Sequence, residues 1–412
     1  MNTQIAFEQV VRRGCGMDVH RDTVVATVMG DGIKKETRTY NTYTTSLKEL
    51  NQWLQSLSVT HVAMESTGVY WKPIYNILEA DFEILLVNAR HVRNVPGHKT
   101  DKKDSVWLTK LLLSGLLKSS FIPPKEIREL RDLTRYRKKL SQQVVAQRNR
   151  FEKVLQDANF KMSNVISDIF GLTGTKLIEA LLNDNNNFEE LLELCHGRIK
   201  TKRDALKEAL TGHLTPHHKF MLRSIRESID DTLCKINVID NQIDSSSASF
   251  KTELQLLQTI PCINKISAAC LLSEMGWDMN KFPSEMHLAS WAGMCPGNNE
   301  SAGKKKTSRI IQGNQYIKPI LVECSWAVSH VKDCYLRSKY ESLIARRGKK
   351  RALIAVGHKI LIAAYHILKN KVPYNDLGYN YLDERRKRNR VQSYIDKLKN
   401  LGVVVHINNE EQ

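Results

Sequence analysis

The sequence predicts an α/β domain at the N-terminus, then a long helical region and a helical C-terminal domain. Strand-like and helix-like segments alternate up to about residue 122, as in a sheet layered with helices. Two long stretches further on repeat apolar residues at heptad spacing, which is typical of a coiled coil. From residue 251 the pattern becomes helical and more compact.

These patterns divide the 412 residues into four parts, and this length suits two or three domains with sizeable cores. We expect an α/β domain, a basic coiled-coil and helical insert, a helical C-terminal domain, and a basic tail that is poorly ordered. Their residue ranges are 1–122, 123–250, 251–382 and 383–412.

The net charge of +18 and the pI near 9.5 favour a polyanionic partner over a merely basic soluble protein. The 8 cysteines form no CxxC pair, so we interpret them as reduced thiols, with neither a disulfide framework nor a zinc site. We find no signal-peptide core in residues 1–13 and no apolar run of membrane-spanning length. We therefore expect a cytoplasmic protein without membrane contact, which in a bacterium includes the nucleoid.

The first domain should contain four strand segments, the first with a short break, and three helices. Thr100 is the expected N-cap of the last helix, and Gly115 its expected stop. A loop should cover residues 88–98. The expected strands are 14–29, 33–41, 61–64 and 82–87, and the expected helices are 45–57, 71–79 and a helix that begins at residue 101.

Two acids open this last helix on an unexpected face. Asp101 and Asp104 share a stripe with Leu108 and Leu111, which should be the buried stripe. Acids normally avoid a buried stripe. One interpretation is that both carboxylates merely favour the positive end of the helix dipole. The other is that they belong to a site.

Two more acids lie at strand ends, where sites form in layered α/β sheets. Asp18 is in the first strand, and Glu65 ends a middle strand. Each alone is more simply a surface acid. Together with Asp101 and Asp104 they could converge on Mg²⁺, which prefers a few carboxylates plus water and phosphate oxygens. Two such ions can clamp both sides of a phosphodiester.

The region 123–250 contains two heptad helices, at 126–156 and around 222–243, with shorter helices between them. The two could pair within one chain as an antiparallel hairpin, or between chains. The first is strongly basic on its other faces. Its charges suit either a solvated surface or phosphate contact.

The C-terminal domain should hold helices on both sides of a loop at 293–306. We expect two helices joined by a turn over 252–276 and further helices at 284–292, 314–331 and 351–370. In the loop, Ser301 is followed by Lys304, Lys305 and Lys306, which could bind a phosphate or present a hydroxyl nucleophile. From spacing alone, a plain basic loop is favoured. Basic groups at 346–351 and 385–390 are two further phosphate-binding candidates.

Five motifs together resemble the DEDD transposases of the insertion-sequence one-ten type, which are related to the Piv-type DNA invertases. They occur in family order and span nearly the whole chain. The motifs are GMDVH at 16–20, MESTGVYW at 64–71, VNARHVR at 87–93, KTDKKD at 99–104 and PGNNESAGK at 296–304.

The resemblance implies an N-terminal RNase H-like fold similar to the RuvC junction resolvase. It implies that Asp18, Glu65, Asp101 and Asp104 bind Mg²⁺ and that Ser301 attacks DNA. It also implies a structured guide RNA and a dimeric or tetrameric assembly, with composite sites that pair one subunit's tetrad with another's serine. We assign nucleic-acid contacts to the basic residues of the matching segments and the serine loop, namely Arg90, Arg93, Lys304, Lys305, Lys306 and Arg309.

One turn departs from the family pattern. Its Pro-Gly-Ile-Gly turn is here PCIN at 261–264, with both glycines replaced. This weakens the expectation that the turn binds a DNA backbone.

The leading hypothesis is therefore a transposase that cuts and rejoins DNA through a covalent phosphoserine, with divalent metal and a guide RNA. The alternative is a metal-dependent Holliday-junction-type endonuclease that hydrolyses DNA without Ser301. A non-catalytic nucleic-acid-binding protein is a third hypothesis, which the complete tetrad disfavours.

Overall fold

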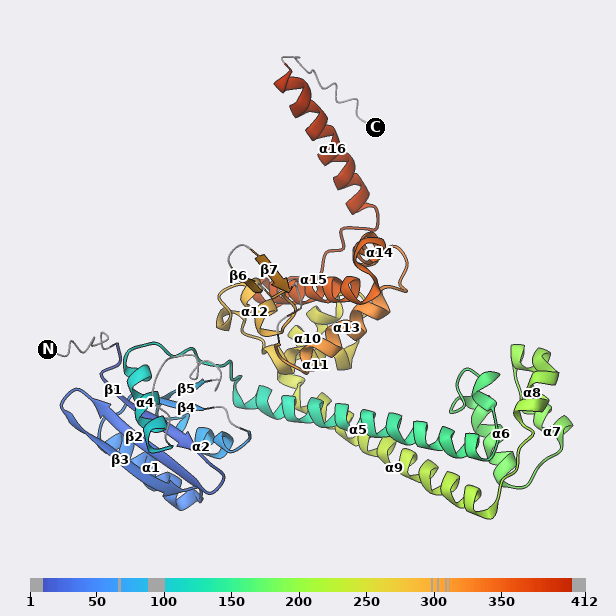
Figure 1. Ribbon diagram of the computed structural model, residues 1–412, viewed down its shortest axis with the longest axis horizontal. Coiled ribbons are helices and arrows are strands. Elements are labelled where there is room, and N and C mark those ends of the chain that lie inside the picture. Colours follow the sequence, from blue (N-terminus) through green and yellow to red (C-terminus); the bar gives the residue numbers. More distant parts are fainter. Residues whose placement is uncertain are drawn as a thin grey trace. The chain divides into compact units, whose positions relative to one another are not determined.

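The computed structural model of the protein (Figure 1) describes residues 10–65, 68–87, 101–297, 299–301, 304–307, 310 and 312–401. For residues 101–103, 299–301 and 304–307 it describes the backbone alone. The chain forms two compact units that meet between Ile122 and Pro123.

The first unit is built on a five-stranded mixed sheet with the strand order β3-β2-β1-β4-β5. The first three strands form an antiparallel meander, and β4 and β5 continue the sheet in parallel with β1. This confirms the predicted α/β domain. The elements are β1 Arg13–Val19, β2 Thr23–Gly30, β3 Ile33–Asn41, α1 Thr44–Ser56, β4 His61–Glu65, α2 Trp71–Leu78, β5 Glu83–Val87 and α4 Asp101–Leu113.

Strand alternation gives the sheet two different faces. Met17, Met64 and their neighbours point into a core that α1 and α2 cover. Ala63 and Val87 point the other way and pack against Leu108 and other apolar residues of α4. Because the side-chain period of a strand is two, Asp18 and Glu65 lie on the face that carries α4.

The helix α4 lies unusually close to β1 because β1 has glycines on that face. A Cβ on Gly16 would stand 2.5 Å from both the Ser105 carbonyl oxygen and the Thr109 amide nitrogen. The Gly16 amide donates to Thr109 Oγ1 at 3.0 Å, and Thr109 Oγ1 donates to the Thr27 carbonyl at 3.0 Å. Ser105 and Thr109 are fully buried, so these hydrogen bonds fix α4 on β1 and β2.

The C-terminal end of α4 is the predicted stop. Gly115 has φ +65°, its amide donates to the Leu112 carbonyl, and the Leu116 amide donates to the Leu111 carbonyl. This pair of bonds is a Schellman motif, which satisfies the last carbonyls of the helix. Thr100, the expected N-cap, lies outside the described residues.

The second unit begins with two long helices that pair within the chain as an antiparallel hairpin (Figure 1). These are α5 Lys125–Asp157 and α9 Pro216–Ser246. The Arg137 guanidinium pairs with Asp240, and His218 Nε2 lies 3.0 Å from Asp157 Oδ2 at the far end. The shorter helices α6 Leu172–Leu182, α7 Phe188–Glu193 and α8 Arg203–Ala209 share a core with the hairpin.

The remaining helices form a bundle around α15 Lys349–Asn370, as the predicted helical C-terminal region requires. We expected no apolar run long enough to cross a membrane, but α15 is one by length and composition. Half of its most apolar stretch is buried, against α10, α12, α13 and α14, so it is the core helix of this bundle. The bundle contains α10 Lys251–Gln258, α11 Lys265–Met275, α12 Glu285–Trp291, α13 Ile317–Val328 and α14 Tyr335–Arg347.

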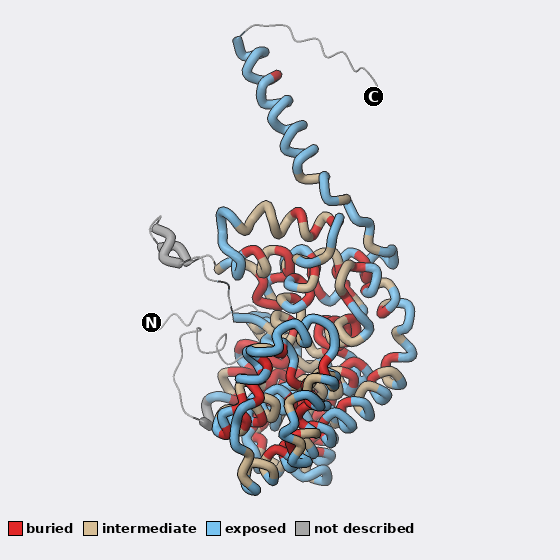
Figure 2. The backbone as a smooth tube through the Cα atoms, turned by 90° about the vertical axis from the view of Figure 1, so that its right-hand side faces the viewer, coloured by how far each residue is buried: buried red, intermediate tan, exposed pale blue. Residues whose placement is uncertain are grey.

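Two expectations for this unit were incomplete. The loop expected at 293–306 contains a short antiparallel hairpin, β6 Asn299–Ser301 and β7 Lys304–Thr307. The tail expected to be poorly ordered contains a helix, α16 Tyr381–Asn400. In Figure 2, α16 is exposed along nearly its whole length. A helix without an apolar face against a core has a weak sequence signal, which explains why periodicity missed it.

Candidate active site

Asp18 and Glu65 lie side by side at the carboxyl ends of two parallel strands. The register pairs Met17 of β1 with Met64 of β4, so the next residues along are Asp18 and Glu65. Both are on the face that carries α4. The structure therefore brings these two predicted site residues together at one edge of the sheet.

The first turn of α4 lies at the same edge. Leu112 lies against Gly14 at the start of β1, and Thr109 binds Gly16 further along, so α4 runs antiparallel to β1. The helix therefore starts over the end of β1 that holds Asp18. Asp104 is exposed there, although Leu108 and Leu111 below it are buried as predicted. The expectation that both acids would share a buried stripe is thus wrong for Asp104, while the side chain of Asp101 lies outside the described part.

Asp18 has a neighbour that we did not assign from the sequence. His20 Nε2 lies 3.1 Å from Asp18 Oδ2 in a hydrogen bond, or in an ion pair when the imidazole is protonated. The Asp18 side chain is 17% exposed and that of His20 is 52% exposed. The D-x-H spacing on a strand end was the available signal, since residues two apart on a strand share a face.

The chemistry of these donors suits a hard cation. All four predicted ligands are carboxylates, the oxygen donors that Mg²⁺ prefers. Among the side chains described, no three Asp, Glu, His or Cys groups form a cluster that could hold a metal ion. The side chain of Asp101 is not described. It would be the fourth carboxylate ligand beside Asp18, Glu65 and Asp104.

Ser301 ends strand β6 in the second unit, paired with Lys304 of β7. The segment that carries this hairpin is clamped at its base. Pro296 forms a β-bridge with Ile310, and the Asn314 amide donates to the Trp291 carbonyl at 3.1 Å. The segment before β6 and the segment after β7 thus meet where the hairpin leaves the bundle. These contacts fix the base of the hairpin next to α12 and α13.

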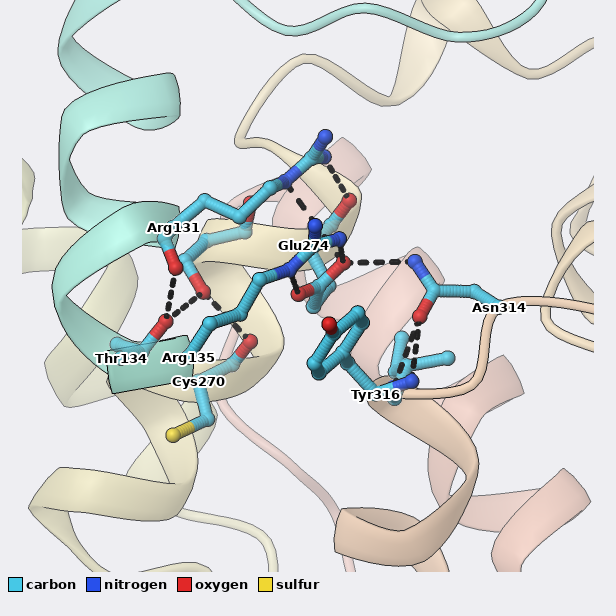
Figure 3. Close-up of polar contacts among 9 residues, drawn as sticks. Arg131, Thr134, Arg135, Cys270, Glu274, Asn314 and Tyr316 are labelled. Carbon is cyan, nitrogen blue, oxygen red and sulfur yellow. Dashed lines mark hydrogen bonds and ion pairs between the residues drawn. The ribbon is translucent and has the colours of Figure 1, made fainter. Parts of the chain in front are cut away.

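Asn314 at this base also contacts a buried carboxylate, that of Glu274 (Figure 3). Glu274 of α11 has a side chain only 2% exposed. Arg135 of α5 donates to both of its oxygens, at 2.7 and 2.8 Å, and Asn314 Nδ2 donates to it at 2.6 Å. Glu274 therefore links α5 and α11 to the segment that follows the hairpin.

Further contacts complete this Glu274 cluster. Asn314 Oδ1 accepts from the Tyr316 amide at 2.8 Å and so caps the start of α13. The Arg135 guanidinium stacks 3.9 Å from the centre of the Tyr316 ring. Arg131 Nη2 donates to the Glu274 carbonyl at 2.6 Å, and burial lowers the pKa of Arg131 to about 10. The sequence offered no periodic signal for this cluster because its members come from three separate elements.

The predicted nucleic-acid-binding residues are described only in part. Arg90, Arg93 and Arg309 lie outside the described residues. Lys304, Lys305 and Lys306 belong to β7, where the backbone alone is described. The arrangement of their side chains stays a prediction.

Comparison with known families identifies the class of protein. A DEDD transposase model of the IS110 type matches residues 15–160, and a model described as the transposase IS116/IS110/IS902 family matches residues 254–341. The first covers the strand-end acids and α4, and the second covers Ser301. The protein is therefore a transposase, an enzyme class that acts on DNA. The chain belongs to the IS110 family, as the motif resemblance predicted.

Two relatives align over most of their length. The chain is 21% identical to a pilin gene-inverting protein of Moraxella bovis over 377 residues, which cover 87% of this chain and 97% of the relative. It is 22% identical to a pilin gene-inverting protein of Moraxella lacunata over 344 residues, which cover 79% and 87%.

Proposed function

We propose that this transposase cuts and rejoins DNA through a covalent phosphoserine intermediate formed at Ser301. The observation that carries the proposal is the meeting of Asp18, Glu65 and the first turn of α4 at one edge of the sheet. The mixed sheet with helices on both faces supports an RNase H-like fold for this unit.

The serine step conserves the number of phosphodiester bonds. The Ser301 oxygen attacks a backbone phosphorus, an O–P bond forms, and the bond to one DNA oxygen breaks. The proton of the serine is transferred to a base, and the released DNA oxygen takes up a proton. Attack by another DNA hydroxyl on the phosphoserine reverses these changes and joins a new strand. Cutting and rejoining then need no external energy source.

Asp18, Glu65, Asp101 and Asp104 would hold the divalent cation. When bound, Mg²⁺ supplies polarisation of the phosphate and stabilises charge on its oxygens. His20 would orient the Asp18 carboxylate through the hydrogen bond described above. The Glu274 cluster would hold the base of the Ser301 hairpin in one position.

We extend the proposal to the partners. A structured RNA encoded by the element would guide target choice, and the protein would act as a dimer or tetramer in the bacterial cytoplasm. In the α5–α9 hairpin, heptad apolar positions such as Leu140, Val144, Ile229 and Ile236 are buried within one chain, which supports an intrachain coiled coil. The net charge of +18 supports contact with both nucleic acids.

The test is an in vitro reaction with purified protein, the element's ends and its transcribed flanking RNA. We expect recombinant DNA with the wild type and none with Ser301→Ala or Asp101→Asn. EDTA should abolish the reaction, and excess Mg²⁺ should restore it. Recombination by Ser301→Ala would refute the serine assignment, and activity that persists in EDTA would refute the tetrad's metal role.

A trapped protein–DNA adduct separates the serine from other hydroxyls. After denaturation, the adduct should be present in the wild type, absent in Ser301→Ala and present in Tyr316→Phe. Tyr316 is the matched hydroxyl control because it lies just before α13 and its ring contact with Arg135 survives in Phe.

The same reaction tests the endonuclease alternative. A wild type that nicks DNA, never rejoins it and forms no adduct would be a hydrolase. Inversion of a gene requires rejoined strands, so the pilin gene-inverting relatives favour recombination.

A further inference from the structure

The fold brings together cations from two basic runs that lie far apart in the sequence. The runs at 346–351 and 385–390 are contributed by the junction of α14 with α15 and by the first half of α16. α14 packs against both α15 and α16 (Figure 1). Lys339 lies one turn after Tyr335 on α14, and Arg385 lies one turn after Tyr381 on α16, and the rings of these two tyrosines are in contact.

The pKa of Lys339 reflects the positive charge that surrounds it. It is half-buried, and its pKa is lowered first by burial and then by Lys359, Arg386, Arg385 and Arg346. The four charged groups that act most strongly on Lys339 are thus all cations. They come from α14, α15 and α16. We call Lys339, Arg346, Lys359, Arg385 and Arg386 together the Lys339 cluster.

The start of α16 is held in place, so the cluster is more than a charged tail that passes by chance. The rings of Tyr335 and Tyr381 pack edge to face with centres 5.7 Å apart. Asp376 Oδ1 accepts from the amides of Tyr335 at 3.0 Å and Gly378 at 2.7 Å. These contacts tie the segment that enters α16 to the start of α14.

One nearby acid, Glu341, pairs outside the cluster, and a second, Asp383, pairs with the cluster residue Arg386. Glu341 accepts from Arg337 Nε at 2.9 Å and from the Tyr379 hydroxyl at 2.5 Å. Asp383 accepts from Arg386 at 3.0 Å, but that pair is largely exposed and weak. Five cations held close together repel one another, and an anionic ligand would remove that cost.

We propose that the Lys339 cluster binds the phosphate backbone of duplex DNA without reading its sequence. The proposal rests on the proposed function, which supplies DNA as the substrate. A backbone carries regularly spaced phosphates and releases condensed counterions when cations neutralise them, so a convergent, exposed cluster of Lys and Arg suits it. Four of the five cations lie beyond residue 341, where the second family match ends.

The test measures the salt dependence of binding of the full-length protein to a short, fluorescently labelled duplex of scrambled sequence. The variant Lys359→Gln/Arg385→Gln removes one cluster cation from each of two helices. The control, Lys397→Gln/Lys399→Gln, removes the same charge from the other end of α16. Thermal unfolding followed by circular dichroism checks that both variants fold.

We expect the slope of log affinity against log salt to become shallower by about 1.8 in the cluster variant, because each phosphate contact contributes about 0.9. Affinity at low salt should fall on the order of tenfold, and the control should change far less. Equal changes in the two variants would overturn the proposal, since only net charge would then matter. The same titration is repeated with single-stranded RNA. If the cluster variant lost affinity for this RNA but not for duplex DNA, the proposal would also be overturned.

These outcomes are separable from those of the proposed function. If the wild type forms no phosphoserine adduct but the cluster variant loses its salt slope, the recombinase mechanism fails and the DNA site stands. If recombination proceeds and the slope is unchanged in the cluster variant, the DNA site fails alone.

Discussion

At the scale of the residue, Gly16 determines how α4 meets the sheet. We predict that Gly16→Ala destabilises the protein by about 1–3 kcal/mol, because the added Cβ would collide with backbone atoms of Ser105 and Thr109. The helix must shift, and Asp104 shifts with it. Urea denaturation gives the free energy of unfolding, and Mg²⁺-dependent adduct formation gives the effect on the site.

Gly14→Ala is the matched control for this prediction. Its Cβ would meet the end of the Leu112 side chain at 2.9 Å, and a side chain can rotate away. We expect the control to cost clearly less free energy. An equal loss in both variants would contradict the view that backbone contact at Gly16 sets the position of α4.

The replaced turn at 261–264 offers a second prediction. Cys262 has φ +64°, a left-handed conformation that costs a non-glycine residue about 1–2 kcal/mol. Cys262→Gly should therefore stabilise the protein by about 0.5–1 kcal/mol after the greater chain entropy of glycine is subtracted. Thermal unfolding measures the gain. Cys262→Ala keeps the strained φ, so a gain of the same size there would show that the thiol was the cause.

This turn was predictable from the sequence only in part. The loss of both family glycines was visible, but the positive φ retained at Cys262 was not. Asn264 replaces the second glycine and caps α11 by accepting from the Ser267 amide at 2.8 Å. Cys262 thus keeps the glycine-like backbone conformation at a cost in strain. Asn264 serves instead as the N-cap of α11.

At the scale of the element, the Glu274 cluster is the predicted support of the Ser301 hairpin. We predict that Glu274→Gln lowers the free energy of unfolding by about 1–3 kcal/mol, because it leaves the half-buried guanidinium groups of Arg135 and Arg131 without their shared carboxylate. Adduct formation should fall as well at temperatures where the variant is folded. Urea denaturation and adduct yield are the two measurements.

Glu323→Gln provides the control for this change. Glu323 is an exposed carboxylate on α13, so the same substitution should alter stability by less than about 0.5 kcal/mol. If Glu274→Gln were as harmless as Glu323→Gln, the cluster would not carry the base of the hairpin.

Elements were predictable where the signal is local and periodic. The five strands of the first unit, the two heptad helices and α15 follow from spacing alone, and all are present. The β6–β7 hairpin was missed because its strands are short and rich in Lys and Asn, residues that strands disfavour. Asp18 and Glu65 were predictable from strand ends. His20 had a local signal in its spacing from Asp18, but Glu274 had none, because its contacts depend on how separate segments pack.

At the scale of the whole molecule, the candidate chemistry is divided between two units. The acids Asp18, Glu65, Asp101 and Asp104 belong to the first unit, and Ser301 belongs to the second. Each unit has its own hydrophobic core. A catalytic centre that combines them can therefore be assembled within one chain or between two chains of an oligomer.

Mixing two inactive variants distinguishes these assemblies, and we predict that activity returns. Ser301→Ala retains the acids and Asp101→Asn retains the serine, so a site shared between subunits is complete in some mixed oligomers. The covalent adduct should then form on the Asp101→Asn chain, which a size tag identifies on a denaturing gel. Each variant alone should form none. If the mixture also forms none, although size-exclusion chromatography shows that the two chains co-assemble, each chain must use its own acids with its own serine.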